Sequence, residues 1–548
     1  MESTGAVTRP AKRPRTTPSA EQAGGVDLIS SLGDDHLVRI LELVGSTKAA
    51  VRTGALSRRW RGLWTRVRAL RFVPSPEFNS SGDAERYAAF VSGVLAQRAR
   101  PGVVVEHLEI SYRAGYLRRP GEEHLLPSSI GAAQGWARFA ARQAVRSFTL
   151  DLFLPLPRDY HNDDSSDDDN DDDGGEGGNN GSINGKQKHQ VMIVLDEFLP
   201  SATKLETMLL SLGGARLRLP GGVVFSSLTD LSLEVEHIKL AAGSGHLLAQ
   251  FLSSSCCPRL KKLYMWGIKL GWPAKDVVLD AGELSELLLV EVEGVALLKL
   301  GTPSLRALHI DHFSVEALTI SAPRLEELTF LHSELKADRV DGDLSCVGSL
   351  ELDSHDETSV FLLKRCTSAT RLDVSLESPE GADTMRGRVA QLPHVTSLIV
   401  HLSPRFKRHT FGDGLASLFT RFSNLTFLGL HLGELDGSTN KWYELYSTSD
   451  EDSNFNCDHP DNWKSNEIVL AHLQEAEFTG LTGMDCEFRF LQFVLASTTK
   501  LQKVGVSFKP NCFQEGRSDD LALRLLGSGT WTACCDAYRQ CYEWRPCP

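Results

Sequence analysis

The chain has 548 residues, of which 41% are hydrophobic, and a formal net charge of -13. Nine acidic residues and no basic residue lie between Asp163 and Glu176, so the remainder carries a charge of only about -4. This balance argues against nonspecific nucleic-acid binding, which needs a basic face to neutralise phosphates. We expect no membrane span, because there is no run of 18 uncharged apolar residues. The eleven irregularly spaced cysteines, with no secretory leader before them, indicate reduced thiols.

Residues 1–25 are rich in Pro, Thr, Gly and Ala and are predicted to form a disordered basic tail. The tail contains a compact basic cluster at Lys12, Arg13 and Arg15. Such a cluster is typical of a nuclear import signal, although a simply solvated tail has the same composition.

Residues 26–73 form the first predicted domain, with three short helices. Asp34 and Asp35 are well placed to begin the first helix. Its apolar residues follow at helical spacing, namely Leu37, Ile40, Leu41 and Val44. Ser46 or Thr47 is expected to cap the second helix, and Ser57 the third.

The third predicted helix has a strongly apolar face made by Trp60, Leu63, Trp64 and Val67. So small a domain cannot bury this much apolar surface internally, and a partner is expected to cover part of it. The same helix carries the basic residues Arg58, Arg59, Arg61, Arg66 and Arg68. A DNA-reading helix is an alternative interpretation, but arginines opposite an apolar face are more typical of a solvated surface.

A repeat occupies residues 74–510. An apolar-x-x-apolar-x-apolar triplet begins at Val105, Val145, Leu205, Leu228, Leu260, Leu284, Leu305, Leu325, Val347, Ala369, Val395, Leu425, Leu473 and Leu501. From Leu284 to Ala369 the successive starts lie 21, 20, 22 and 22 residues apart. This period is typical of one strand and a short return segment per repeat, so we predict an α/β solenoid with a parallel sheet.

Two insertions interrupt this repeat. Residues 160–190 are acidic and glycine-rich and are predicted to be disordered, with a binding arm for a basic partner as the alternative. Residues 433–466 form a polar insertion that contains several aromatic residues. Residues 511–548 are predicted to be a C-terminal extension.

Two polar runs resemble metal ligands, and we predict that neither binds a metal. The first comprises His309, Asp311 and His312, and the second comprises Asp353, His355, Asp356 and Glu357. His309 lies between two apolar triplet positions and is expected to point away from the core, where contact with a target is the simpler interpretation. The chain also lacks phosphate-loop, hydrolase-elbow and zincin motifs, so nothing in it predicts an enzyme.

Residues 27–73 closely resemble the F-box of plant F-box proteins. The matching positions are Asp27, Ile29, Leu32, Ala50, Val51, Arg52, Thr53, Leu56, Ser57, Arg59, Trp60, Arg61, Leu63 and Trp64. Gly33 departs from the pattern, because the family usually has proline there. The repeats are similar to the leucine-rich repeats of the same group, and residues 467–510 are similar to its FBD segment.

The resemblance implies a non-catalytic, cofactor-free substrate receptor of a Skp-cullin-F-box ubiquitin ligase, acting in the nucleus, the cytoplasm or both. Contact with the Skp-type adaptor, and through it with cullin, would fall to Leu28, Leu32, Leu37, Ile40, Leu41, Val51, Leu56, Trp60 and Leu63. The protein target is expected to meet outward polar residues of the repeats, for example Glu286, Arg306, His309, Glu327 and Thr329. The alternative is a non-ligase interaction scaffold with a degenerate F-box, for which Gly33 is the only argument. No nucleic acid, membrane or metal partner is expected.

Overall fold

The computed structural model describes residues 28–547, apart from stretches of five residues or fewer and the segments 75–79 (except 78), 115–125, 154–191, 195–202, 377–390, 403–410, 433–461 and 510–520. It divides into two compact units, Met1–Val67 and Arg68–Pro548. The predicted basic tail, the acidic insertion and most of the polar insertion lie outside the described residues.

The N-terminal unit consists of short helices. They are α1 (Leu28–Ser31), α2 (Asp34–Leu43), α3 (Thr47–Arg52) and the 3-10 helices η1 (Thr53–Ala55) and η2 (Trp60–Arg66). Ser46 caps α3 as expected, because its hydroxyl accepts a hydrogen bond of 3.4 Å from the amide of Ala49. The prediction of a third α-helix capped by Ser57 is wrong: a 3-10 helix begins at Trp60 instead. Gly62 lies in the middle of this seven-residue segment, and glycine costs about 1 kcal/mol relative to alanine inside an α-helix.

The second unit is built on a 17-stranded sheet, and the mixed α/β class expected from the sequence is confirmed. In spatial order the strands are β1 (Ala69–Phe72), β2 (His107–Arg113), β3 (Ser147–Phe153), β5 (Thr207–Gly213), β7 (Asp230–Lys239), β8 (Lys262–Lys269), β10 (Glu286–Val290), β12 (Ala307–Asp311), β14 (Glu327–Leu331), β16 (Ser349–Asp353), β17 (Arg371–Leu376), β18 (Ser397–Leu402), β19 (Phe427–Leu432), β20 (Glu475–Leu481), β21 (Lys503–Phe508), β23 (Arg539–Arg545) and β22 (Thr530–Asp536). All neighbouring pairs from β1 to β21 are parallel, whereas β23 is antiparallel to both β21 and β22.

The register of this sheet follows the apolar triplets. Each of the fourteen triplets found in the sequence leads into one strand, from β2 to β21. Leu287, Leu308 and Leu328 are aligned across β10, β12 and β14, and all three are buried. Because side chains alternate along a strand, the intervening positions point to the opposite, outward face.

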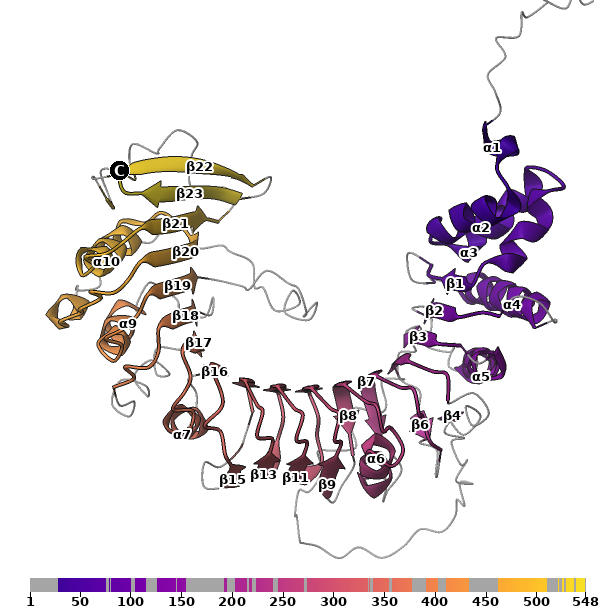
Figure 1. The fold of residues 1–548 in the computed structure, drawn as a ribbon, viewed down its shortest axis with the longest axis horizontal. Coiled ribbons are helices and arrows are strands. Elements are labelled where there is room, and N and C mark those ends of the chain that lie inside the picture. Colours follow the sequence, from indigo (N-terminus) through magenta and orange to yellow (C-terminus); the bar gives the residue numbers. More distant parts are fainter. Residues whose placement is uncertain are drawn as a thin grey trace, which may run out of the picture. The chain divides into compact units, whose positions relative to one another are not determined.

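The remaining elements cover the buried face of the large sheet, and Figure 1 shows them on one side of it. The helices are α4 (Ser81–Arg98), α5 (Leu126–Gln143), α6 (Gly245–Leu252), α7 (Glu357–Arg365), α9 (Phe411–Phe419), α10 (Asp485–Ala496) and the 3-10 helix η9 (Asn462–Ser465). A second parallel sheet contains β9 (Lys275–Asp280), β11 (Val295–Gly301), β13 (Val315–Ser321) and β15 (Val340–Gly342). A small sheet pairs β4 (Met192–Val194) with β6 (Arg216–Arg218).

Two parts of the chain join this architecture without having been predicted to do so. Strands β22 and β23, from the predicted C-terminal extension, pair with β21 and lengthen the large sheet. Trp463, from the polar insertion, is buried against Phe490 and Phe493 of α10, with ring centroids 5.6 and 4.9 Å away. Among the helices that the structure describes, none is both long and apolar enough to cross a bilayer.

Candidate binding surfaces

The N-terminal unit exposes an unusual amount of apolar surface. Ten large hydrophobic residues are exposed in the described chain, and five of them lie in this unit of under seventy residues. We call these five the N-terminal apolar surface: Ile29, Ile40, Leu43, Val44 and Leu56. Ile40, Leu43 and Val44 share one face of α2, because they are spaced at i, i+3 and i+4. Exposed apolar residues gathered in one small unit are typical of a protein-binding surface.

The predicted adaptor residues fall into three groups by burial. Ile40 and Leu56 are exposed and belong to the N-terminal apolar surface. The half-buried ones are Leu32, Val51 and Trp60, and the buried ones are Leu37, Leu41 and Leu63. The side chain of Leu28 lies outside the described residues. Their role in adaptor binding stays a prediction, and the buried three contribute to the packing of α2 against η2.

Sequence reasoning missed Leu43 of this surface, although the helical spacing from Ile40 could have found it. Leu43 and Leu56 are each 72% exposed, more than any other large hydrophobic residue in the described chain.

The arginines near η2 are not merely a solvated remainder. Arg59 donates a 2.9 Å hydrogen bond from Nε to Asp34, and a second one to the carbonyl oxygen of Leu32. Arg66 pairs with Asp35 at 2.5 Å. These contacts join the start of α2 to η2, so both arginines are already engaged by carboxylates.

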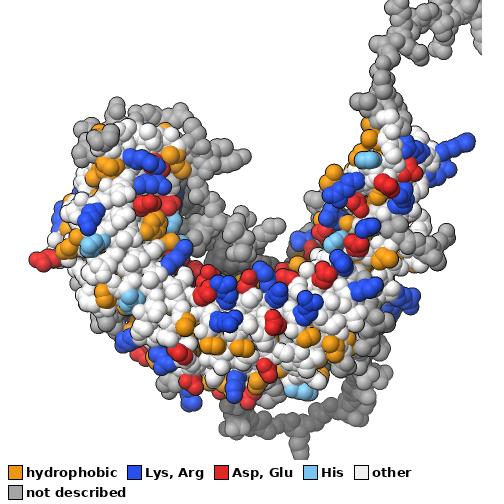
Figure 2. All heavy atoms as spheres, viewed as in Figure 1, with side chains coloured by type: hydrophobic (Ala, Val, Ile, Leu, Met, Phe, Trp, Pro, Cys, Tyr) orange, Lys and Arg blue, Asp and Glu red, His pale blue; other side chains and the backbone are white. Residues whose placement is uncertain are grey.

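The outward face of the large sheet is the second candidate surface. Figure 2 shows acidic and basic side chains intermixed along the strands from β8 to β16. Several of them form ion pairs between neighbouring repeats, such as Lys262 with Glu286 at 2.8 Å and Arg306 with Glu326 at 2.7 Å. Exposed pairs of this kind contribute little to stability.

The predicted target residues gather on β10, β12 and β14. Glu286 and Glu327 are exposed at the starts of β10 and β14, and Arg306 is exposed just before β12. His309 and Thr329 lie side by side in register, and the Thr329 hydroxyl donates a 3.0 Å hydrogen bond to Glu351. Their contact with a target is untested and stays a prediction.

Burial shifts the pKa values of two side chains on this face. It lowers the pKa of His309, which favours the neutral imidazole, although the nearby Asp311 acts in the opposite direction. It also raises the pKa of Glu351. Half-buried groups of both kinds bind a complementary charge or hydrogen-bond partner more strongly than fully solvated ones do.

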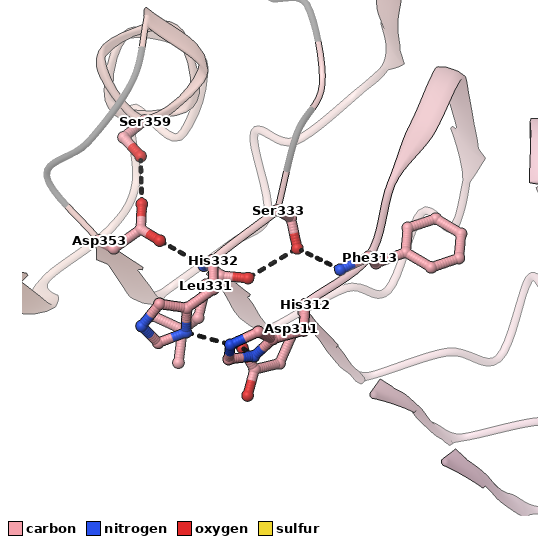
Figure 3. Close-up of polar contacts among 8 residues, drawn as sticks. All are labelled: Asp311, His312, Phe313, Leu331, His332, Ser333, Asp353 and Ser359. Carbon is pink, nitrogen blue, oxygen red and sulfur yellow. Dashed lines mark hydrogen bonds and ion pairs between the residues drawn. The ribbon is translucent and has the colours of Figure 1, made fainter. Parts of the chain in front are cut away.

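Of the first metal-like run, the structure brings Asp311 and His312 together with His332 from the next repeat. Asp311 is buried at the end of β12, and its Oδ1 lies 2.8 Å from Nδ1 of His312 and 2.9 Å from Nδ1 of His332 (Figure 3). Burial would raise the pKa of Asp311, but the two histidine contacts outweigh it and hold that pKa well below its usual range. In the second run, His355 and Asp356 lie outside the described residues, while Asp353 accepts a hydrogen bond from the backbone amide of His332.

A second pair of histidines stacks further along the same face. The rings of His401 on β18 and His431 on β19 lie 4.9 Å apart at 14°. His431 Nδ1 lies 2.6 Å from the hydroxyl of Thr479. Burial, followed by the neighbouring His431 and Arg371, lowers the pKa of His401 to about 4.

Comparison with known proteins places these surfaces in context. No family model matches the chain. Two FBD-associated F-box proteins of Arabidopsis thaliana are 28% and 29% identical to it over 127 and 126 residues, which are 23% and 22% of this chain. An F-box/LRR-repeat protein of the same plant is 34% identical over 94 residues, 16% of this chain and 23% of its own length.

The chain therefore has Arabidopsis homologues among the FBD-associated F-box and F-box/LRR-repeat proteins. The resemblance noted in the sequence is confirmed at this level. The chain spans only about a quarter of the length of these relatives, 27% and 28% for the first two.

Proposed function

We propose that this protein is a non-catalytic substrate receptor of a Skp-cullin-F-box ubiquitin ligase. In this proposal the N-terminal unit is an F-box that docks on a Skp-type adaptor, and the second unit is a leucine-rich-repeat solenoid that binds a protein target. The N-terminal apolar surface is the observation that supports it most strongly, because exposed leucines need a partner to cover them. The names of the Arabidopsis homologues point in the same direction.

A receptor of this kind forms and breaks no bond itself. Its contribution is proximity, because a target held near a charged ubiquitin carrier reacts at a much higher effective concentration. The N-terminal unit would recruit the ligase while the outward face of β8 to β19 holds the target. We further propose residence in the nucleus, the cytoplasm or both, with Lys12, Arg13 and Arg15 as the import signal.

The proposal is tested by titrating a purified Skp-type adaptor into the full-length chain. We expect the native chain to bind and the Leu43→Asp/Leu56→Asp double variant to lose binding, because both side chains are exposed and neither substitution disturbs a core. Val469→Asp is the matched control: Val469 is 65% exposed but lies in the second unit. Failure of the native chain to bind any Skp-type adaptor would overturn the proposal.

A substitution at Gly33 provides a second test, which distinguishes a ligase receptor from a scaffold with a degenerate F-box. Gly33 caps α2 with φ -66°, a value that the proline ring also imposes. A Cβ at this position would meet only His36 Nδ1, at 3.7 Å. If Gly33→Pro binds the adaptor and the native chain does not, the degenerate scaffold is favoured. Equal affinities favour the receptor.

A further inference from the structure

Three ligand-type side chains converge at one edge of the outward face. Asp311 ends β12, His312 follows it, and His332 follows the neighbouring strand β14, whose Leu331 is in register with Asp311. A candidate ligand atom from each of the three lies within 4.8 Å of the others. The two imidazole rings are stacked, with centroids 4.5 Å apart at 25°, and Figure 3 shows them beside the Asp311 carboxylate.

The backbone holds both histidines in an uncommon conformation. His312 and His332 have φ values of 48° and 45°, in the left-handed region that L-residues adopt at a cost of about 1–2 kcal/mol. In the two preceding repeats the same position is occupied by Gly267 with φ 70° and by Glu291 with φ 52°. The conformation thus belongs to the repeat, and histidine occupies it where glycine would be less strained. Strained positions of this kind gather at functional sites.

Neighbouring groups hold the backbone of the two histidine-bearing turns. The backbone amide of His332 donates to Asp353, whose other carboxylate oxygen lies 3.5 Å from the Ser359 hydroxyl. The Ser333 hydroxyl accepts a 3.1 Å hydrogen bond from the amide of Phe313 and donates one of 2.6 Å to the carbonyl oxygen of Leu331. This support leaves the ring positions preorganised, as a metal-binding shell requires.

The donor set suits a zinc-like ion. Imidazole nitrogen and carboxylate oxygen bind Zn²⁺ at about 2.0–2.2 Å. Two ligands at the tetrahedral angle around such an ion lie about 3.3–3.6 Å apart by that bond length. The distances of 2.8 and 2.9 Å from Asp311 to the two histidines would therefore each open by about 0.4–0.8 Å to admit the ion. The side chain of His312 is 42% exposed, which gives an ion a path from solvent.

We propose that Asp311, His312 and His332 form a three-ligand site for Zn²⁺ or a chemically similar transition-metal ion. Three protein ligands leave a further coordination position open toward the outward face, where water or a donor group of a bound partner completes the shell. The competing interpretation is a metal-free cluster in which both imidazoles donate to one carboxylate. The site does not depend on the proposed ligase role, because it is defined by this chain alone.

The test is titration of the chelator-treated full-length chain with Zn²⁺ by calorimetry, and with Co²⁺ by visible absorption. We expect one tight ion per chain, with no competition from Mg²⁺ or Ca²⁺, which prefer all-oxygen shells. Asp311→Asn and His332→Ala should each weaken binding by at least about 10- to 100-fold, the loss typical of changes even to outer-shell partners.

The His312→Gly variant distinguishes the loss of a metal ligand from a loss of folding stability. Glycine relieves the left-handed strain, so this variant should keep its stability in chelator and still lose the ion. His401→Gln is the matched control, because it removes a stacked histidine elsewhere on the same face and should leave the affinity unchanged. Absence of tight binding by the native chain would establish the metal-free cluster instead, and equal affinity in His312→Gly would overturn the proposed ligand set by showing that the ion binds elsewhere. Neither outcome bears on adaptor binding.

Discussion

Gly480 on β20 is a position where a single methyl group should disrupt the large sheet. Its φ is 74°, and the register with β21 shifts between Phe478 and Leu481, so β20 bulges at this point. A Cβ added to Gly480 would overlap the carbonyl oxygen of Leu432 on β19 and lie 2.9 Å from its carbonyl carbon. The backbone of β19 cannot rotate aside as a flexible side chain could.

The expected cost of Gly480→Ala has two parts. The left-handed conformation costs an alanine about 1–2 kcal/mol. Relief of the overlap requires a backbone shift, for which overpacked sites typically lose about 1–3 kcal/mol. We therefore expect the free energy of unfolding of the second unit to fall by about 2–5 kcal/mol.

The assay is urea unfolding of the full-length chain followed by circular dichroism, with Gly505→Ala as the matched control. Gly505 lies in register on the adjacent strand β21, and a Cβ there would meet only Glu477 Cγ, at the ordinary distance of 3.8 Å. The control should change stability by less than about 1 kcal/mol. Equal stability of the two variants would refute the bulge geometry.

Two further predictions concern buried polar groups. The pKa of His401 is about 4 in the folded chain and 6.5 for the free side chain. The unfolded state therefore takes up a proton first as pH falls. Up to about 3 kcal/mol of stability should be lost between pH 6.5 and 4. His401→Gln should flatten this part of the stability-versus-pH curve, and an unchanged slope would count against the lowered pKa. The buried carboxylate of Glu487 accepts hydrogen bonds from the amides of Thr482 at 3.0 Å and Gly483 at 2.8 Å. Glu487→Gln should cost about 3 kcal/mol in urea unfolding, the upper range for a hydrogen bond to a charged group, whereas a loss below 1 kcal/mol would show that these bonds are weak.

The strands of the large sheet could be predicted because their signal is local. An apolar triplet records both the strand and the face that it buries, so the alignment of Leu287, Leu308 and Leu328 follows from the repeat itself. The second sheet could also have been predicted from a regular spacing, because β9, β11 and β13 begin 20 residues apart at Lys275, Val295 and Val315.

Other features depended on contacts that no local pattern records. The C-terminal hairpin pairs with β21 through backbone hydrogen bonds, which leave little trace in side-chain type. The segment after Ser57 has helical apolar spacing, yet Gly62 and a short length leave it as the 3-10 helix η2. Leu37 is buried and Leu56 is exposed, although both are leucines in the same expected motif, and the sequence alone does not distinguish them.

The histidine cluster shows how a repeat can build a site that no single segment contains. His309, Asp311 and His312 are close in sequence, but the cluster contains Asp311, His312 and His332 from the next repeat, while His309 is not part of it. His332 follows His312 by 20 residues, the interval between the local triplets at Leu305 and Leu325, so stacking brings equivalent positions together. In a parallel stack, then, candidate ligands are found by comparing the same position in successive repeats. The left-handed position that follows β8, β10, β12 and β14 is one such position, and it is held in turn by Gly267, Glu291, His312 and His332.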